Sequence, residues 1–66
     1  MTIKEIKEYI KEELEIQKEI AYYDGQRFNK QFRDDIKIAT LNCLHLDGKI
    51  TDEQYNKMLK YYKLED

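Results

Sequence analysis

The apolar residues between Phe28 and Leu46 recur with the period of an α-helix, and this segment constrains the fold most strongly. They stand three or four positions apart throughout: Phe28, Phe32, Ile36, Ala39, Cys43 and Leu46. This spacing places them on one face of a helix about five turns long. Ile38, Leu41 and Leu44 widen that face on one side. A helix with so broad an apolar face is expected to be a central element with more than one neighbour, and Cys43 is expected to be a small core residue.

Residues 3–23 are predicted to form a second long helix. Thr2 and Glu5 have the spacing of a capping box, and Asp24-Gly25 provides a left-handed stop. The apolar residues form two neighbouring tracks. The first track is Ile3, Ile6, Ile10 and Leu14, and the second is Tyr9, Ile16, Ile20 and Tyr23. Together they cover about half of the helix circumference, at about 100° per residue.

Two polar residues, Glu13 and Gln17, interrupt this apolar arc. A buried carboxylate must be paired or protonated. One interpretation is a hydrogen-bonded structural pair, or a position where the arc opens to water. The other is a polar contact that specifies the register of a partner helix.

The final segment, about residues 52–63, is predicted to be a shorter helix. Asp47-Gly48 ends the preceding helix, and Thr51 and Gln54 form a second capping box. The expected buried face consists of Tyr55, Met58, Leu59 and Tyr62. Residues 1–66 are therefore predicted to form a single all-α domain. Its three helices run up-down-up, two long (about 3–23 and 28–46) and one short (about 52–63).

Composition narrows the classes of function. One cysteine excludes an intrachain disulfide and the usual zinc frameworks, and the chain contains no catalytic motif or phosphate loop. We expect no enzyme, no cofactor and no metal site. No apolar run approaches the roughly 20 residues of a membrane span, so a cytoplasmic protein without a membrane partner is expected. A net charge of −2 provides no overall attraction to nucleic acids.

Helix length is the main evidence for a partner. A short third helix covers only a little over half of the long pair, running out beside residues 13–16 and 34–35, while the apolar arcs continue beyond it. Three aromatic pairs are predicted to converge at that uncovered pole. The expected partner-binding residues are Ile16, Ile20, Tyr22, Tyr23, Arg27, Phe28, Phe32, Tyr61 and Tyr62. Exposed tyrosine and arginine are typical of binding hot spots, so we expect a second copy (a homodimer) or another protein to bind there.

A second candidate is a nucleic-acid-binding regulator. Its basic face would comprise Arg27, Lys30, Arg33 and Lys37, on the outer side of the 28–46 helix. Against it, the next helix would present Asp52 and Glu53 to the phosphates. We therefore favour protein binding without catalysis. A small, acidic, single-domain chain dominated by residues with AT-rich codons looks like a phage or mobile-element accessory protein. By analogy with anti-CRISPR proteins, we expect such a protein to inhibit a host protein by occupying its surface.

Residues 41–59 resemble the SHOCT family of short helical hairpins. The similarity is carried by Leu44-His45-Leu46-Asp47-Gly48-Lys49-Ile50-Thr51-Asp52-Glu53-Gln54-Tyr55. It matches the family's pattern of a leucine-rich helix, a glycine turn, Ile-Thr, acidic residues, an aromatic residue and a lysine-rich helix, with Gln54 where the family often has Glu. The resemblance implies a role in association.

Overall fold

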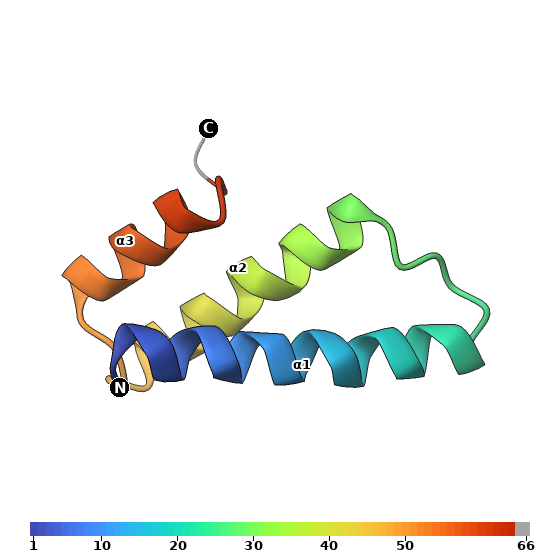
Figure 1. The fold of residues 1–66 in the computed structure, drawn as a ribbon, viewed down its shortest axis with the longest axis horizontal. Coiled ribbons are helices and arrows are strands. Elements are labelled where there is room, and N and C mark those ends of the chain that lie inside the picture. The colour runs from blue at the N-terminus through green and yellow to red at the C-terminus, as the bar shows by residue number, and fades with distance from the viewer. Residues whose placement is uncertain (65–66) are drawn as a thin grey trace.

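The computed structural model describes residues 1–64, which form three helices in an up-down-up order (Figure 1). α1 spans Ile3–Tyr23, α2 spans Lys30–Leu46 and α3 spans Asp52–Tyr61. The predicted all-α class is confirmed. α2 begins at Lys30 rather than at residue 28, because the Asn29 side chain caps the helix by accepting a hydrogen bond from the Phe32 amide (2.9 Å). α3 ends at Tyr61 rather than at residue 63.

Both predicted capping boxes are present. The Thr2 hydroxyl accepts from the Glu5 amide (3.1 Å), and the Glu5 carboxylate accepts from the Thr2 amide (2.9 Å). Thr51 and Gln54 make the same reciprocal pair at the start of α3 (3.1 and 3.0 Å). These bonds satisfy amides that a helix N-terminus leaves without intrahelical partners, so α1 and α3 begin where the sequence predicts.

All three helices end in a left-handed turn. Gly25 (φ 72°) follows α1 and Gly48 (φ 73°) follows α2, at the two predicted stops. After α3 the same conformation is taken by Lys63 (φ 57°), and the Leu64 amide donates to the Leu59 carbonyl (2.9 Å). This turn is what ends α3 early, because a left-handed residue cannot continue the helix.

The core lies where the beginning of α1, the end of α2 and α3 meet. Its buried members are Ile6, Ile10, Leu41, Leu44, Ile50 and Met58. Around them pack the half-buried Ile3, Leu14, Tyr55, Leu59, Tyr62 and Leu64. The first apolar track of α1 therefore faces the core. Leu41 and Leu44, which were expected only to widen the apolar face of α2, are the residues of α2 at the centre of the core.

The main apolar stripe of α2 departs from the prediction. Ala39 and Cys43 are exposed and Leu46 is 85% exposed, while Phe28, Phe32 and Ile36 are half-buried. The expectation that Cys43 fills the core was wrong. α2 is rotated so that Leu41 and Leu44 point inward, which turns the small residues of the stripe outward.

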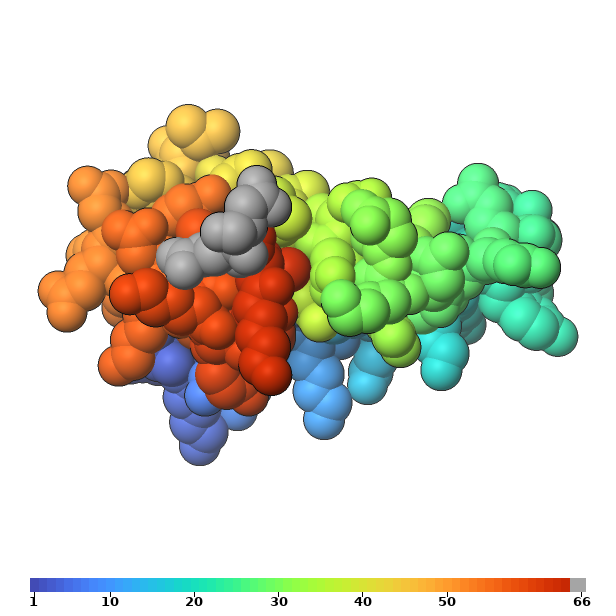
Figure 2. All heavy atoms as spheres, turned by 90° about the horizontal axis from the view of Figure 1, so that it is seen from above, coloured from blue at the N-terminus to red at the C-terminus, as the bar shows by residue number. Residues whose placement is uncertain are grey.

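α3 covers only one half of the hairpin formed by α1 and α2. Figure 2 shows α3, in orange and red, over one end of the molecule, while the first turns of α2, in green, extend beyond it. α1 and α2 diverge toward the connecting loop (Figure 1). The short third helix thus leaves most of the splayed end uncovered, as the sequence predicted.

The three aromatic pairs do not converge at one pole. The Lys7 ammonium lies 4.0 Å from the centre of the Tyr61 ring, and that of Lys37 lies 5.0 Å from the Tyr62 ring. Lys7 precedes Tyr22 by about 22 Å along α1, at 1.5 Å per residue. Because α3 stops beside Lys7 rather than beside residues 13–16, its two tyrosines remain far from those that end α1.

Polar contacts hold the corner between α2 and α3. The His45 imidazole contacts the Asp52 carboxylate and stacks on the Tyr55 ring, with centroids 4.7 Å apart. The Tyr55 hydroxyl donates to the Asn42 side chain. The Gln54 amide donates to the Met1 carbonyl (2.6 Å), which ties α3 to the start of α1. These contacts set the direction of α3 and so determine which side of the hairpin it covers.

Candidate functional site

One side of the α1–α2 hairpin carries exposed apolar residues from both helices. On α1 these are Tyr9, Ile16 and Ile20, which are 44%, 52% and 48% exposed. On α2 they are Ala39, Cys43 and Leu46. We call these six residues the hairpin face. They lie away from α3, so the second apolar track of α1 remains open to solvent along its length.

A groove runs between the two helices within the hairpin face. It consists of two adjoining hollows of about 330 and 250 Å³, which share Glu13, Ala39 and Thr40. Phe32 and Ile36 line the hollow toward the loop, and Tyr9 and Cys43 line the other. A groove between two helices, with apolar and charged residues in its walls, has the shape that accepts an amphipathic helix.

Polar groups in the groove already have hydrogen-bond partners. The Gln17 amide donates to the Glu13 carboxylate (3.1 Å), and the Thr40 hydroxyl donates to the Ile36 carbonyl (2.7 Å). Glu13 and Gln17 are half-buried and paired, which agrees with the first interpretation of these residues. Among residues 1–64 no buried side-chain nitrogen or oxygen lacks a partner. The buried polar groups of the groove therefore need no ligand as a hydrogen-bond partner, and a ligand would be held by apolar contacts and by charge.

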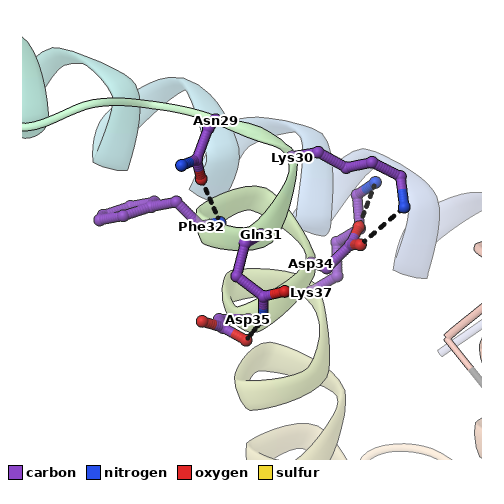
Figure 3. A network of polar contacts seen from close by, with 7 residues as sticks. All are labelled: Asn29, Lys30, Gln31, Phe32, Asp34, Asp35 and Lys37. Atoms are coloured by element: carbon purple, nitrogen blue, oxygen red, sulfur yellow. Dashed lines mark hydrogen bonds and ion pairs between the residues drawn. The ribbon is translucent and has the colours of Figure 1, made fainter.

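The charge around the groove is mostly negative. Glu13, Asp35 and Asp47 line it, and Lys49 is the cation that the lining includes. Asp35 is held by the Gln31 amide (2.9 Å), a neutral donor that leaves its charge in place (Figure 3). The N-terminal ammonium donates to the Lys49 carbonyl (3.0 Å), so the cations gather at that end and a ligand meets negative potential mainly beside Glu13 and Asp35.

The predicted partner-binding residues separate into groups. Phe32 lines the groove and Ile16 and Ile20 are exposed on the hairpin face, whereas Tyr61 and Tyr62 lie beside Lys7 and Lys37. Tyr22 and Tyr23 are 80% and 78% exposed, and Arg27 is also exposed. The Phe28 ring lies 5.5 Å from that of Phe32. Tyr22 follows Lys18 by four positions and shares a shallow depression with it, on the other side of α1 from Ile20.

Four residues of the hairpin face were not predicted as binding residues: Tyr9, Ala39, Cys43 and Leu46. The signal that could have identified them is the pair Glu13 and Gln17. A polar pair inside an apolar arc marks where burial ends, and Tyr9 and Ile16 lie beyond that border on the helix.

The predicted basic face of α2 is partly neutralised. Lys30 and Lys37 both pair with Asp34, at 3.4 and 3.8 Å (Figure 3). Lys37 is half-buried against Tyr62, so its charge is not directed to solvent. Arg27 and Arg33 remain exposed. Arg27 and Arg33, which form no ion pair with another residue in the range 1–64, make a small footprint for a phosphate backbone.

The structure describes residues 1–64. Within this range, no three side chains of His, Cys, Asp or Glu come together in a way that could hold a metal ion. None of the helices described there combines the length and the apolar character needed to cross a membrane.

The chain was compared with family models, curated proteins and solved structures. None of them matches it. The resemblance of residues 41–59 to SHOCT hairpins therefore stays a prediction. The local geometry of that segment is a capped helical corner, with Gly48 left-handed and Ile50 buried.

Proposed function

We propose that this protein is a small binding module that acts through association with another protein, and that the hairpin face is its binding surface. The single observation that carries the proposal is the exposure of apolar side chains on both helices of the hairpin, three of which (Tyr9, Ala39 and Cys43) line one groove. Large contiguous apolar surface on a small domain is typical of an interaction site. The role as an inhibitor of a host protein, in a phage or mobile element, remains a prediction from composition.

The packing supports this proposal. Ile16 and Ile20 are each about half exposed although their helix carries Ile6 and Ile10 in the core. At roughly 25 cal/mol per Å² of apolar surface, covering such side chains is favourable for any complementary partner. α3 covers one side of the α1–α2 hairpin, and the partner would cover the other side, which carries the hairpin face.

Nucleic-acid binding is the second candidate, and the structure favours it less. Lys30 and Lys37 are engaged with Asp34, and the groove beside α2 is acidic. A phosphate-binding surface would need these cations free.

The proposal can be tested by photo-crosslinking in cells that produce the protein. A photoreactive amino acid is placed at Ile16 or Leu46, on the hairpin face, and at Lys11 or Lys57 as exposed controls elsewhere. We expect the same discrete adduct from Ile16 and Leu46 and none from the two controls. Equal adducts from all four positions, or none from the hairpin face, would refute the proposal.

A further inference from the structure

The exposed track of α1 has the spacing of a coiled-coil seam. Tyr9, Glu13, Ile16, Ile20 and Tyr23 follow one another by four and three positions alternately. This is the a/d alternation by which one helix packs along another. In that register Tyr9, Ile16 and Tyr23 occupy d positions, while Glu13 and Ile20 occupy a positions.

The open edge of this seam carries only negative charge. Glu12 and Glu19 are both exposed, and each lies three or four positions from Ile16, so both flank it on the helix surface. They occupy g positions, which face the charged flank of a partner helix. The other edge faces the groove, where Glu13 and Asp35 add further negative charge.

A second copy is a poor partner for this seam. In an antiparallel pair, Glu12 and Glu19 of the two copies face each other. In a parallel pair, Glu19 faces Asp24. Either arrangement brings carboxylates together, and like charges across a helical interface act against pairing. The lysines of α1 that could relieve this, such as Lys7 and Lys11, lie toward α3 or on the outer surface.

We infer that the hairpin face binds a basic amphipathic helix of another protein, with an apolar stripe flanked by lysine or arginine, rather than a second copy of this chain. The apolar stripe covers Tyr9, Ile16 and Ile20 on α1 and Ala39 and Cys43 on α2. The basic flanks meet Glu12 and Glu19 outside and Glu13 and Asp35 within the groove. This inference rests on the proposed function and adds the chemistry of the partner.

Two model peptides test the partner's charge. Both are hydrocarbon-stapled helices of about 20 residues with leucine at the a and d positions, long enough to span the track. One carries lysine at the flanking positions and the other glutamate. Binding is measured by fluorescence anisotropy at low and high salt. We expect the lysine peptide to bind at least about tenfold more tightly, with a preference that shrinks at high salt because the charges are screened.

A matched pair of variants locates the effect. Glu12→Lys combined with Glu19→Lys reverses the flank of the seam, and we expect it to reduce the preference for the lysine peptide at least about fivefold. Glu8→Lys combined with Glu15→Lys makes the same charge change one row further from the seam, where both side chains share a shallow depression with Glu12. We expect this pair to reduce the preference by less than the seam variant does, because a charge acts more weakly with distance, and an equal reduction by the two pairs would contradict the assigned flank. All four side chains are exposed, so matched thermal unfolding curves verify that folding is retained.

The outcomes separate this inference from the proposed function. If both peptides bind equally and Ile16→Ser abolishes that binding, the inference of a basic partner helix is refuted, whereas the proposed apolar binding surface is retained. Binding of neither peptide would overturn the inference, and crosslinks from Ile16 in cells would then show that the surface binds something else. Sedimentation of wild type as a dimer that Ile16→Ser dissociates would also overturn it, because the occupant would be a second copy.

Discussion

Two isoleucines on α1 permit a direct test of which apolar track forms the core. Ile10 is fully buried, whereas Ile20 is 48% exposed, and both are replaced by alanine. Ile10→Ala removes a buried side chain and leaves a cavity, so we expect a loss of about 3 kcal/mol in the free energy of unfolding. Ile20→Ala removes a side chain that is already about half exposed to solvent, and it leaves no cavity. We expect a loss of about 0.5 kcal/mol there, because alanine's higher helix propensity offsets part of the transfer term.

These losses are large against the stability of so small a chain. At about 0.05–0.15 kcal/mol per residue, 66 residues have a total of about 3–10 kcal/mol. Ile10→Ala would therefore remove a third or more of it. Urea unfolding followed by circular dichroism at 222 nm measures both variants, with the slope m checked for constancy. If Ile10→Ala does not fold, Ile10→Val is the substitute, with an expected loss of about 1 kcal/mol.

Equal losses for the two alanine variants, or a larger loss for Ile20→Ala, would refute the assignment of the first track to the core. Either result would mean that the second track, rather than the first, lies inside the fold. The hairpin face would then have no apolar surface on α1 to offer a partner.

Three further perturbations test local features. Lys63→Gly relieves the left-handed backbone at the end of α3 (φ 57°), and a gain of about 0.5–1 kcal/mol in urea unfolding is expected; no gain would contradict the assignment of this turn. Asn29→Ala removes the cap of α2 and should cost about 1 kcal/mol, whereas Asn29→Asp should retain most of it. Burial, and secondarily the neighbouring Tyr61, raises the pKa of Tyr62 above its ordinary value of 10.0. The contribution of Tyr62 to stability is therefore fully present below pH 10 and is lost as the pH rises further, because the phenol ionises first in the unfolded chain. Tyr62→Phe should make the fall in stability at alkaline pH less steep. An identical fall in wild type and variant would contradict this expectation.

Local signals in the sequence predicted the helix boundaries well. Thr2 with Glu5 and Thr51 with Gln54 form capping boxes whose partners lie within the same turn, so no tertiary information is needed to identify them. The glycine stops at Gly25 and Gly48 are likewise local. The observed bounds differ from the approximate predicted ones by two residues at the start of α2, where Asn29 is the cap, and at the end of α3, where Lys63 adopts the conformation that glycine usually takes.

The direction in which each apolar face points was harder to predict. α1 has two tracks of helical period, and spacing alone does not tell which one is buried. The choice depends on where α3 lies, and that is set by contacts between distant residues, such as Gln54 with Met1 and Tyr55 with Asn42. The same contacts place Tyr61 beside Lys7, far from the end of α1 where the sequence suggested a shared aromatic pole.

Of the candidate site, the sequence predicted Ile16, Ile20 and Phe32, because an apolar arc too wide for its neighbours indicates an uncovered surface. It did not predict the contribution of Ala39, Cys43 and Leu46. Their spacing is that of a core stripe, and only the rotation of α2 about its axis, which buries Leu41 and Leu44 instead, exposes them.

The reactivity of Cys43, the single cysteine of the chain, tests the central claim that the hairpin face is open in the free protein and covered by a partner. Alkylation of wild-type protein by iodoacetamide is timed in buffer, in urea and with saturating lysine peptide. We predict a rate in buffer within about tenfold of the rate in urea, and a further slowing of at least about tenfold with the peptide. A thiol that reacts in buffer about a thousandfold more slowly than in urea, as expected for a core residue exposed only by global unfolding, would contradict the account.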